Sequence, residues 1–232
     1  MPSPANDWIE RLPDDRLIAE FSLWSADLLR LEAEIARVEP HADLFHVDVA
    51  DGHFSRALLF FPDLVAGVRR ATGRPIHVHL MVADDVLLDQ AEQFAAAGAD
   101  LISVHAENAA AAAALDLLDD RGVAAGLVLN VETPVAAAWP FLDRIRFLTL
   151  LGTPIGVKGR GLDSRSIIRM IEAGVLIAPS RGKCRRLLAA DGGIREETVP
   201  LLRRAGADSV VMGSLAFAAP SLEDRMNWLK GL

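Results

Sequence analysis

The residues best suited to chemistry lie in a short apolar segment, residues 45–54, that ends in a cluster of polar groups. Its His46 and Asp48 are two positions apart, which puts both side chains on one face of a β-strand. Val47 and Val49 then face the other way. An imidazole beside a carboxylate can bind a divalent metal ion, transfer protons, or do both. The alternative is a pair that only satisfies the backbone at a strand end.

Two further residues extend this candidate site. His79 and Asp191 lie at the ends of two other apolar segments. Taken singly, each has an ordinary explanation, because a histidine at a strand end is usually hydrogen-bonded and Asp-Gly-Gly is usually a turn. Together with His46 and Asp48 they supply two imidazoles and two carboxylates, a ligand set that suits one divalent ion of Zn, Fe, Mn or Co. The combination favours a metal site.

Three other histidines are weaker candidates, and we assign none of them as a ligand. His77 shares a strand face with His79 and can simply pack beneath the site. His105 ends another apolar segment and can line a pocket. His53 follows the first segment in a polar stretch.

Elements that position these residues can be read from hydrophobic periodicity, because strand-length apolar segments alternate with helical patterns. Strands are expected at 17–22, 43–49, 75–81, 101–105, 123–130, 145–151, 186–190 and 209–212. The first expected helix has Ser25 as its N-cap and is stopped by Pro40. Another has Asp84 and Asp85 as caps and runs to residue 97. The other expected helices lie at 63–71, 108–120, 164–173 and 195–205, with a short one that starts at Pro134 and a last one that starts at about 221.

This alternation predicts the fold class α/β, as a single (β/α)8 barrel over residues 1–232 with residues 1–16 as a lead-in. An open doubly wound sheet is the alternative, but no G-x-G-x-x-G follows the first strand. In a barrel the chemistry gathers at the carboxyl ends of the strands, where the polar clusters fall. A short repeat fits the same alternation: Ala-Gly-Ala-Asp at 97–100 and 205–208, with a weaker copy at 40–43, puts an acidic residue just before a strand.

Glycine pairs after the seventh and eighth expected strands suggest a phosphate site. Gly192 and Gly193 follow one strand, and Gly213 with Ser214 follow the other. Barrels commonly bind phosphate at these two places through backbone N–H groups. Two ordinary turns are the alternative, but finding both pairs at these two strands favours phosphate. In the preceding loop, residues 152–161, Lys158 and Arg160 either reach the substrate or keep the loop solvated.

Composition narrows the functional classes. The 232 residues are 51% hydrophobic and carry a net charge of −8, without a basic stripe, so we expect no nucleic-acid partner. The single Cys184 excludes a disulfide framework. The polar N-terminus is not a signal peptide, and no apolar run approaches the ~20 residues that span a membrane. We therefore expect a cytoplasmic protein with no membrane partner. A homo-oligomer is also expected, although the composition does not identify the oligomeric state.

The chain resembles the ribulose-phosphate 3-epimerase family. Its matching motifs occur in the family's order at 21–27 (Phe-Ser-Leu-Trp-Ser-Ala-Asp), 46–54, 79–82 (His-Leu-Met-Val), 126–130 with Thr133-Pro134, 191–194 (Asp-Gly-Gly-Ile) and 213–214. The resemblance implies a (β/α)8 barrel and a divalent metal held by His46, Asp48, His79 and Asp191. It makes Asp48 and Asp191 the acid–base pair of an isomerase that inverts the carbon next to the keto group of a phosphorylated ketose.

The same resemblance implies the substrate contacts. It places Ser22 and His79 against the sugar, and it gives the phosphate to Gly192, Gly193, Gly213 and Ser214. The residues agree with such chemistry independently, because epimerisation needs a base on one face of the carbon and an acid on the other, and a metal stabilises the enediolate charge.

The chain departs from the family pattern in residues that are expected to lie near the substrate. The family usually has Met where Ala50 stands and Pro-Asn in the stretch of Arg56-Ala57. Its loop after the sixth strand usually reads Asn-Pro-Gly-Phe-Gly-Gly, whereas residues 153–161 read Thr-Pro-Ile-Gly-Val-Lys-Gly-Arg-Gly. We therefore hypothesise an epimerase whose ketose phosphate differs from ribulose 5-phosphate, for example allulose 6-phosphate.

Two other functions remain open at this point. The relatives of orotidine-phosphate decarboxylase, which include aldolase-like barrels, carry Asp-x-Lys-x-x-Asp at this strand. Counting from Asp48, this chain has Ala50 in place of the lysine and His53 in place of the second aspartate. A catalytically silent barrel that only binds a sugar phosphate is the second alternative, and the presence of both Asp48 and Asp191 weighs against it.

Overall fold

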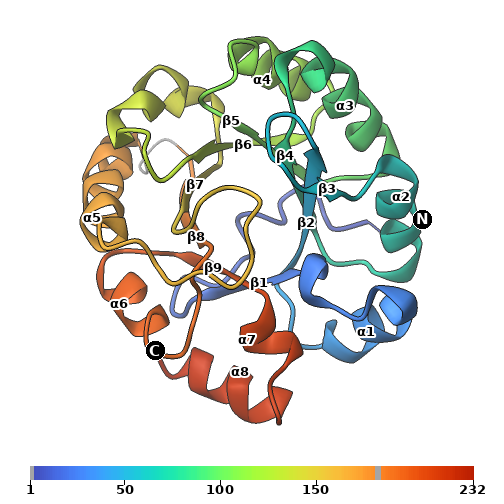
Figure 1. Cartoon of the computed structure of the whole chain (residues 1–232), viewed down its shortest axis with the longest axis vertical. Coiled ribbons are helices and arrows are strands. Elements are labelled where there is room, and N and C mark those ends of the chain that lie inside the picture. Colours follow the sequence, from blue (N-terminus) through green and yellow to red (C-terminus); the bar gives the residue numbers. More distant parts are fainter. Residues whose placement is uncertain (1–2, 181–183) are drawn as a thin grey trace.

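Parallel strands close into a ring in the computed structural model, which describes residues 3–180 and 184–232 (Figure 1). The ring follows the order β1-β9-β8-β7-β6-β5-β4-β2, and a parallel β1–β2 pairing closes it. Its strands are β1 Ile18–Ser22, β2 Leu44–Asp51, β4 Ile76–Met81, β5 Leu101–His105, β6 Ala124–Leu129, β7 Phe147–Leu151, β8 Leu187–Asp191 and β9 Ser209–Met212. The expected (β/α)8 barrel is confirmed.

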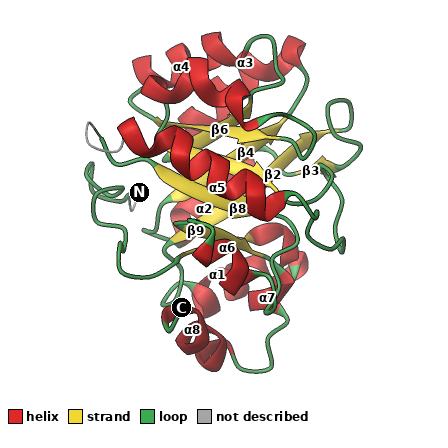
Figure 2. Cartoon of the chain, turned by 90° about the vertical axis from the view of Figure 1, so that its left-hand side faces the viewer, coloured by secondary structure: helices red, strands yellow, loops and turns green. Residues whose placement is uncertain are grey.

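Helices surround this ring on the outside (Figures 1 and 2). The α-helices are α1 Leu31–Val38, α2 Pro62–Ala71, α3 Asp84–Ala97, α4 Ala111–Asp120, α5 Ser166–Ile177, α6 Val199–Arg204, α7 Ser214–Phe217 and α8 Leu222–Lys230. Short 3-10 helices are η1 Leu23–Ser25, η2 Leu28–Arg30, η3 Val135–Arg144 and η4 Ala178–Ser180. Within the described residues, no helix combines the length and apolarity needed to cross a membrane.

Several local expectations were wrong. Ser25 ends η1 and caps no helix, whereas the Asp27 side chain accepts the N–H of Leu29 at the start of η2. Asp84 and Asp85 lie in the first turn of α3, where their negative charge suits the helix dipole, instead of capping it. A two-residue strand, β3 Leu58–Leu59, pairs antiparallel with the end of β2 and was not expected.

The repeated acidic residue before a strand has a clear structural role. Asp43 accepts the backbone N–H of Ala19 at 2.9 Å. Asp100 accepts the N–H of Ile76 at 2.8 Å, and Asp208 accepts that of Leu188 at 2.8 Å. Each carboxylate therefore joins the beginning of its own strand to the beginning of a neighbouring strand, which anchors the amino-terminal end of the ring.

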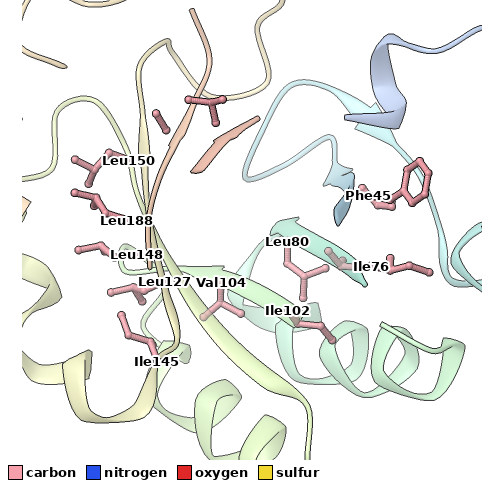
Figure 3. Close-up of a cluster of buried hydrophobic side chains, with 14 of the residues drawn as sticks. Phe45, Ile76, Leu80, Ile102, Val104, Leu127, Ile145, Leu148, Leu150 and Leu188 are labelled. Atoms are coloured by element: carbon pink, nitrogen blue, oxygen red, sulfur yellow. The ribbon is translucent and has the colours of Figure 1, made fainter. Parts of the chain in front are cut away.

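Side chains alternate along each strand, so one set faces outward toward the helices and the other faces into the barrel. Apolar residues that face outward pack between the strands and the helices (Figure 3). The inward residues form layers. A lower layer is apolar and is closed by Trp8 and Ile9 of the lead-in; its members include Ile18, Leu44, Leu101, Phe147 and Leu187. Above it the inward residues are polar, and these lead up to the mouth of the barrel.

Candidate active site at the mouth of the barrel

Three strands bring the four predicted ligands together at the mouth. His46 and Asp48 come from β2, His79 from β4 and Asp191 from β8. Asp48 lies directly beside His79 in the β2–β4 register. The predicted division of β2 into two faces is confirmed by position, since Val47 and Val49 are buried in the outer apolar core.

Distances between these side chains are short enough for one shared ion. Nε2 of His46 lies 3.3 Å from Oδ1 of Asp48 and 4.0 Å from Oδ2 of Asp191. Nδ1 of His79 lies 3.4 Å from the same Asp48 oxygen and 3.7 Å from the same Asp191 oxygen. One ligand atom from each of the four residues lies within 4.8 Å of all the others.

Unpartnered ring nitrogens support the fit of a metal to this group. His46 and His79 are both buried, yet Nε2 of His46 and Nδ1 of His79 have no hydrogen-bond partner among the described residues. Buried polar atoms are nearly always paired, so two orphaned nitrogens aimed at the same carboxylates call for a ligand between them. Two nitrogens and two oxygens suit a divalent transition-metal ion.

The surroundings of Asp48 and Asp191 shift the pKa values of the two carboxyl groups in opposite directions. Burial and the neighbouring negative charge of Asp48 raise the pKa of Asp191 to about 6. Burial also works to raise the pKa of Asp48, but the adjacent His46 and His79 reverse this and hold that pKa below its ordinary value. Burial works to lower the pKa of His46, and the Asp48 carboxylate nevertheless keeps it well above the usual range. The pair therefore combines an ionised carboxylate with a carboxyl group that titrates near neutrality.

A cavity of about 400 Å³ opens directly above these residues. Ser22 lines it and donates a hydrogen bond from Oγ to Oδ2 of Asp48 at 2.9 Å. Of the glycine pairs, Gly192, Gly213 and Ser214 line the cavity. Gly193 lies outside the lining, and a Cβ there would meet Cα of Leu162 at 2.7 Å, so close packing against the segment that leads into α5 requires glycine.

The loop 152–161, which we call the lid, forms one wall of this cavity and joins β7 to α5 (Figure 1). Lys158 and Arg160 both line the cavity. Lys158 donates a hydrogen bond to the carbonyl of Trp24, and its Nζ lies 4.4 Å from the centre of the Trp24 ring. Gly156 has a φ of +67°, and a Cβ there would collide with Ser55, so glycine is needed where the lid meets the loop after β2.

The weaker histidine candidates occupy three different environments. His77 lies beneath the site, fully buried, and contacts Ser103 and Glu20. His105 is fully buried behind His79, with 2.8 Å between their Nε2 atoms, and does not line the cavity. Burial lowers the pKa values of both His77 and His105 to about 4. His53 lies in an exposed turn.

Two carboxylates next to the site were missed by the sequence analysis. Glu20 is fully buried inside the barrel and contacts Nδ1 of His46. Glu107 contacts Nδ1 of His105. A signal for Glu20 was available, because a charged residue in the apolar strand β1, two positions before Ser22, must face the barrel interior. Glu107 follows the end of β5 and has no comparable signal.

Comparison with known proteins places this chain in a family. A sequence model of the Ribulose-phosphate 3 epimerase family matches residues 18–217. The chain belongs to this family. It is 35% identical over 212 residues to the ribulose-phosphate 3-epimerase of Bacillus subtilis (strain 168), covering 90% of this chain and 96% of that protein. It is also 35% identical over 207 residues to ribulose-phosphate 3-epimerase 2 of Cupriavidus necator, covering 87% and 85%. The protein is therefore an isomerase of the epimerase type.

Solved structures agree with the fold alone. A 3-hexulose-6-phosphate synthase from Salmonella typhimurium superposes with a TM-score of 0.70 at 15% identity, covering 93% of this epimerase-family chain and 97% of the synthase. The orotidine 5′-phosphate decarboxylase from Pyrococcus horikoshii OT3 gives a TM-score of 0.65 at 14% identity, with 92% and 97% coverage. At such identities the likeness extends to the barrel and not to the reaction.

Proposed function

We propose that this protein is a metal-dependent epimerase that inverts the carbon next to the keto group of a phosphorylated ketose. The observation that carries the proposal is the pair Asp48 and Asp191, which meet at the barrel mouth beside the same ring nitrogens of His46 and His79. Two carboxyl groups in one site can supply the base and the acid that inversion of a carbon needs.

Asp48 and Asp191 divide the proton transfers between them. Asp48, ionised at neutral pH, is placed to remove the proton from the carbon next to the ketone, which leaves an enediolate. Asp191, which holds its proton more tightly, is placed to deliver a proton to the opposite face. In the reverse reaction the two residues exchange roles. The hydrogen bond from Ser22 holds the Asp48 carboxylate in one orientation during this transfer.

One divalent metal ion completes the site in this proposal. His46, Asp48, His79 and Asp191 are the residues that would hold it, since their ligand atoms converge and two of the nitrogens lack other partners. When bound, such an ion supplies positive charge that stabilises the enediolate oxygens. Metal analysis of the purified protein should find about one transition-metal ion per chain, and His79→Ala should lose it.

The other residues of the site are proposed to bind the substrate. Ser22 and His79 would contact the sugar, and Gly192, Gly213 and Ser214, which line the cavity, would bind the phosphate, in part through backbone N–H groups. Gly193, which lies outside the lining, would support the turn beside Gly192. The names of the relatives make ribulose 5-phosphate the first substrate to test. A second candidate is another ketose phosphate such as allulose 6-phosphate, because the lid, which lines the cavity, departs in sequence from the loop that the family usually has there.

A substrate panel with isotope exchange tests the proposal. The metal-loaded protein should exchange the hydrogen on the carbon next to the ketone with deuterium from the solvent, and kcat/KM across ketose phosphates should identify the sugar. Asp191→Asn should bind the substrate without epimerising it. Binding without exchange in the wild type would instead support a catalytically silent barrel. Homo-oligomeric assembly and a cytoplasmic location stay predictions, and light scattering tests the first.

A further inference from the structure

Glu20 is a charged group at the centre of the barrel that the proton transfers do not use. Its side chain is fully buried. Oε2 lies 3.2 Å from Nδ1 of His46 and 2.7 Å from Nδ1 of His77, and Oε1 accepts a hydrogen bond from Oγ of Ser209 at 2.6 Å. The two ring nitrogens and the hydroxyl can all donate to this one buried carboxylate, and such surroundings favour its ionised form. Glu20 therefore serves as a hydrogen-bond acceptor below the metal ligands.

An ionised carboxylate determines where the hydrogen lies on a histidine ring. It accepts hydrogen bonds and cannot donate them, so the ring nitrogen that faces it must carry the hydrogen. For His46 that nitrogen is Nδ1. Its Nε2, which points toward Asp48, is then left to present a lone pair once a metal replaces any proton there.

A second carboxylate reaches His79 through an intervening ring. Oε2 of Glu107 lies 3.0 Å from Nδ1 of His105, so this nitrogen carries the hydrogen. A neutral imidazole has only one ring hydrogen, so Nε2 of the buried His105 must accept. The partner at 2.8 Å, Nε2 of His79, must then donate. The other ring nitrogen, Nδ1, is then the one that can present a lone pair to a metal, and it faces Asp48 and Asp191.

We propose that Glu20 and Glu107 are positioning residues that fix the ring hydrogens of the two metal-binding histidines. Glu20 acts on His46 directly. Glu107 acts on His79 through His105. The nitrogens left to bind metal, Nε2 of His46 and Nδ1 of His79, then face the same point, so the ring orientation is already set when a metal displaces any remaining proton. This inference rests on the proposed metal-dependent function, because it assigns a role toward the same ion.

The surroundings of Glu107 make its glutamine variant a sharp test. Oε1 of Glu107 accepts the backbone N–H of Asn130 at 2.9 Å, and that donor cannot turn away. In Glu107→Gln the amide oxygen must therefore stay on Asn130, which turns the NH2 group toward Nδ1 of His105. His105 then carries its hydrogen on Nε2, and the hydrogen of His79 moves to Nδ1, on the metal side. Glu107→Ala leaves His105 free to keep either arrangement.

At position 20, in contrast to position 107, glutamine preserves the hydrogen-bond arrangement. In Glu20→Gln the amide oxygen can occupy the place of Oε2, where both histidine N–H groups donate, and the NH2 group can donate to Ser209. The hydrogen arrangement survives and only the charge is lost. Glu20→Leu removes the acceptor. Loss of such outer partners commonly weakens metal binding by about 10–100-fold. Glutamine should therefore be the milder change at position 20 and the more harmful change at position 107.

Zn²⁺ affinity measured by competition with a chelator gives the first readout. Glu20→Leu and Glu107→Gln should each lose about 10–100-fold, while Glu20→Gln and Glu107→Ala should lose less than about ten-fold. Asp43→Asn, which removes a negative charge at the other end of the barrel, is the control and should leave affinity unchanged. Because Glu107 is partly exposed, its variants should fold even where Glu20→Leu does not.

Nitrogen NMR of the histidine rings gives a second readout that needs no metal. The ring hydrogen of His105 should sit on Nδ1 in the wild type and on Nε2 in Glu107→Gln. A wild type that binds no Zn²⁺ would remove the proposed function, and these spectra would still decide the hydrogen arrangement. Equal Zn²⁺ affinity in Glu107→Ala and Glu107→Gln, or an unmoved hydrogen on His105, would overturn the positioning role while leaving the epimerase proposal intact.

Discussion

Ser22 contributes one hydrogen bond to the site, and the strength of that bond sets its expected effect. Its Oγ donates to the Asp48 oxygen that does not face the histidines, so the hydroxyl limits rotation of the carboxylate. A hydrogen bond to a charged group is worth about 1.5–3 kcal/mol. In Ser22→Ala we expect kcat to fall roughly 10-fold or more with metal content retained, measured by steady-state kinetics alongside metal analysis.

Thr149 provides the control for that prediction. It is buried in β7, and its Oγ1 has no partner among the described residues. Thr149→Val removes a hydroxyl from the barrel interior without breaking a hydrogen bond, so kcat should stay near the wild-type value. Equal losses in both variants would assign the Ser22 effect to packing.

At the scale of residues, the sequence allowed prediction of groups that stand out from their surroundings. His46, Asp48, His79 and Asp191 are polar residues at the ends of apolar strands, and the structure brings them together. Glu20 had the same signal within β1 but was not recognised. The link from Glu107 through His105 to His79 could not be found, because it depends on contacts between side chains from two strands and a loop.

Asp51 joins two elements at the edge of the site. Its carboxylate accepts the N–H groups of His53, Phe54 and Ala83, which connect the end of β2 to the segment after β4. Burial works to raise the pKa of Asp51, but these donors hold it below the ordinary value. Stability from this group is therefore present above about pH 4 and is lost as the pH falls below that value.

Asp51→Ala should lower the free energy of unfolding by about 1 kcal/mol at pH 7, a figure reduced because the side chain is partly exposed. The difference from the wild type should shrink below about pH 4, where the wild-type carboxylate gains a proton and becomes a poorer acceptor. Urea unfolding at pH 7 and pH 3 measures both quantities. A difference that persists unchanged at pH 3 would show that the charge of Asp51 is irrelevant.

Lys158 attaches the lid to the 3-10 helix η1, which follows β1. Its contact with the Trp24 ring at 4.4 Å is worth about 0.5–1 kcal/mol, in addition to the hydrogen bond to the Trp24 carbonyl. In Lys158→Met we expect KM to rise roughly five-fold and amide hydrogen exchange in the lid to accelerate. Lys158→Arg keeps a cation over the ring and should restore slow exchange. Faster exchange in both variants would mean that Lys158 does not hold the lid through Trp24.

The positions of the strands and helices could be predicted more accurately than the residues at which they begin and end. Apolar runs located the barrel strands, because both faces of a parallel strand are buried. Helix starts were less accurate: α6 begins at Val199 where a helix from 195 was expected, since Arg195 and Thr198 form a hydrogen-bonded turn first. The segment after Pro134 is a 3-10 helix that contains Pro140, whose missing N–H prevents a regular α-helix. Such details depend on local hydrogen bonds that periodicity does not report.

The closed barrel could be predicted from the alternation of strands and helices alone. The contacts that hold its amino-terminal end together could not. The repeat at 97–100 and 205–208 marked acidic residues without giving their partners. In the structure Asp100 pairs with Arg69 at 2.6 Å, where the side chains are 16% and 3% exposed, and it also accepts the N–H of Ile76. A charge pair so deeply placed holds β4, β5 and α2 together at the end of the barrel opposite the active site.

Asp100→Ala should therefore destabilise the whole molecule while sparing the chemistry. Removing one partner of a buried pair costs about 3–5 kcal/mol, because the charge of Arg69 loses its counter-ion and keeps only the carbonyls of Thr72 and Arg74 as partners. For a chain of this size that loss lowers Tm by roughly 6–20 °C. Glu132→Ala breaks the exposed pair with Arg165, where the side chains are 81% and 46% exposed, and should change Tm by no more than about 2–4 °C. Calorimetry gives both values, and kcat at 25 °C should match the wild type in both variants. Equal Tm shifts would contradict the anchoring role of Asp100, because burial is what distinguishes the two pairs.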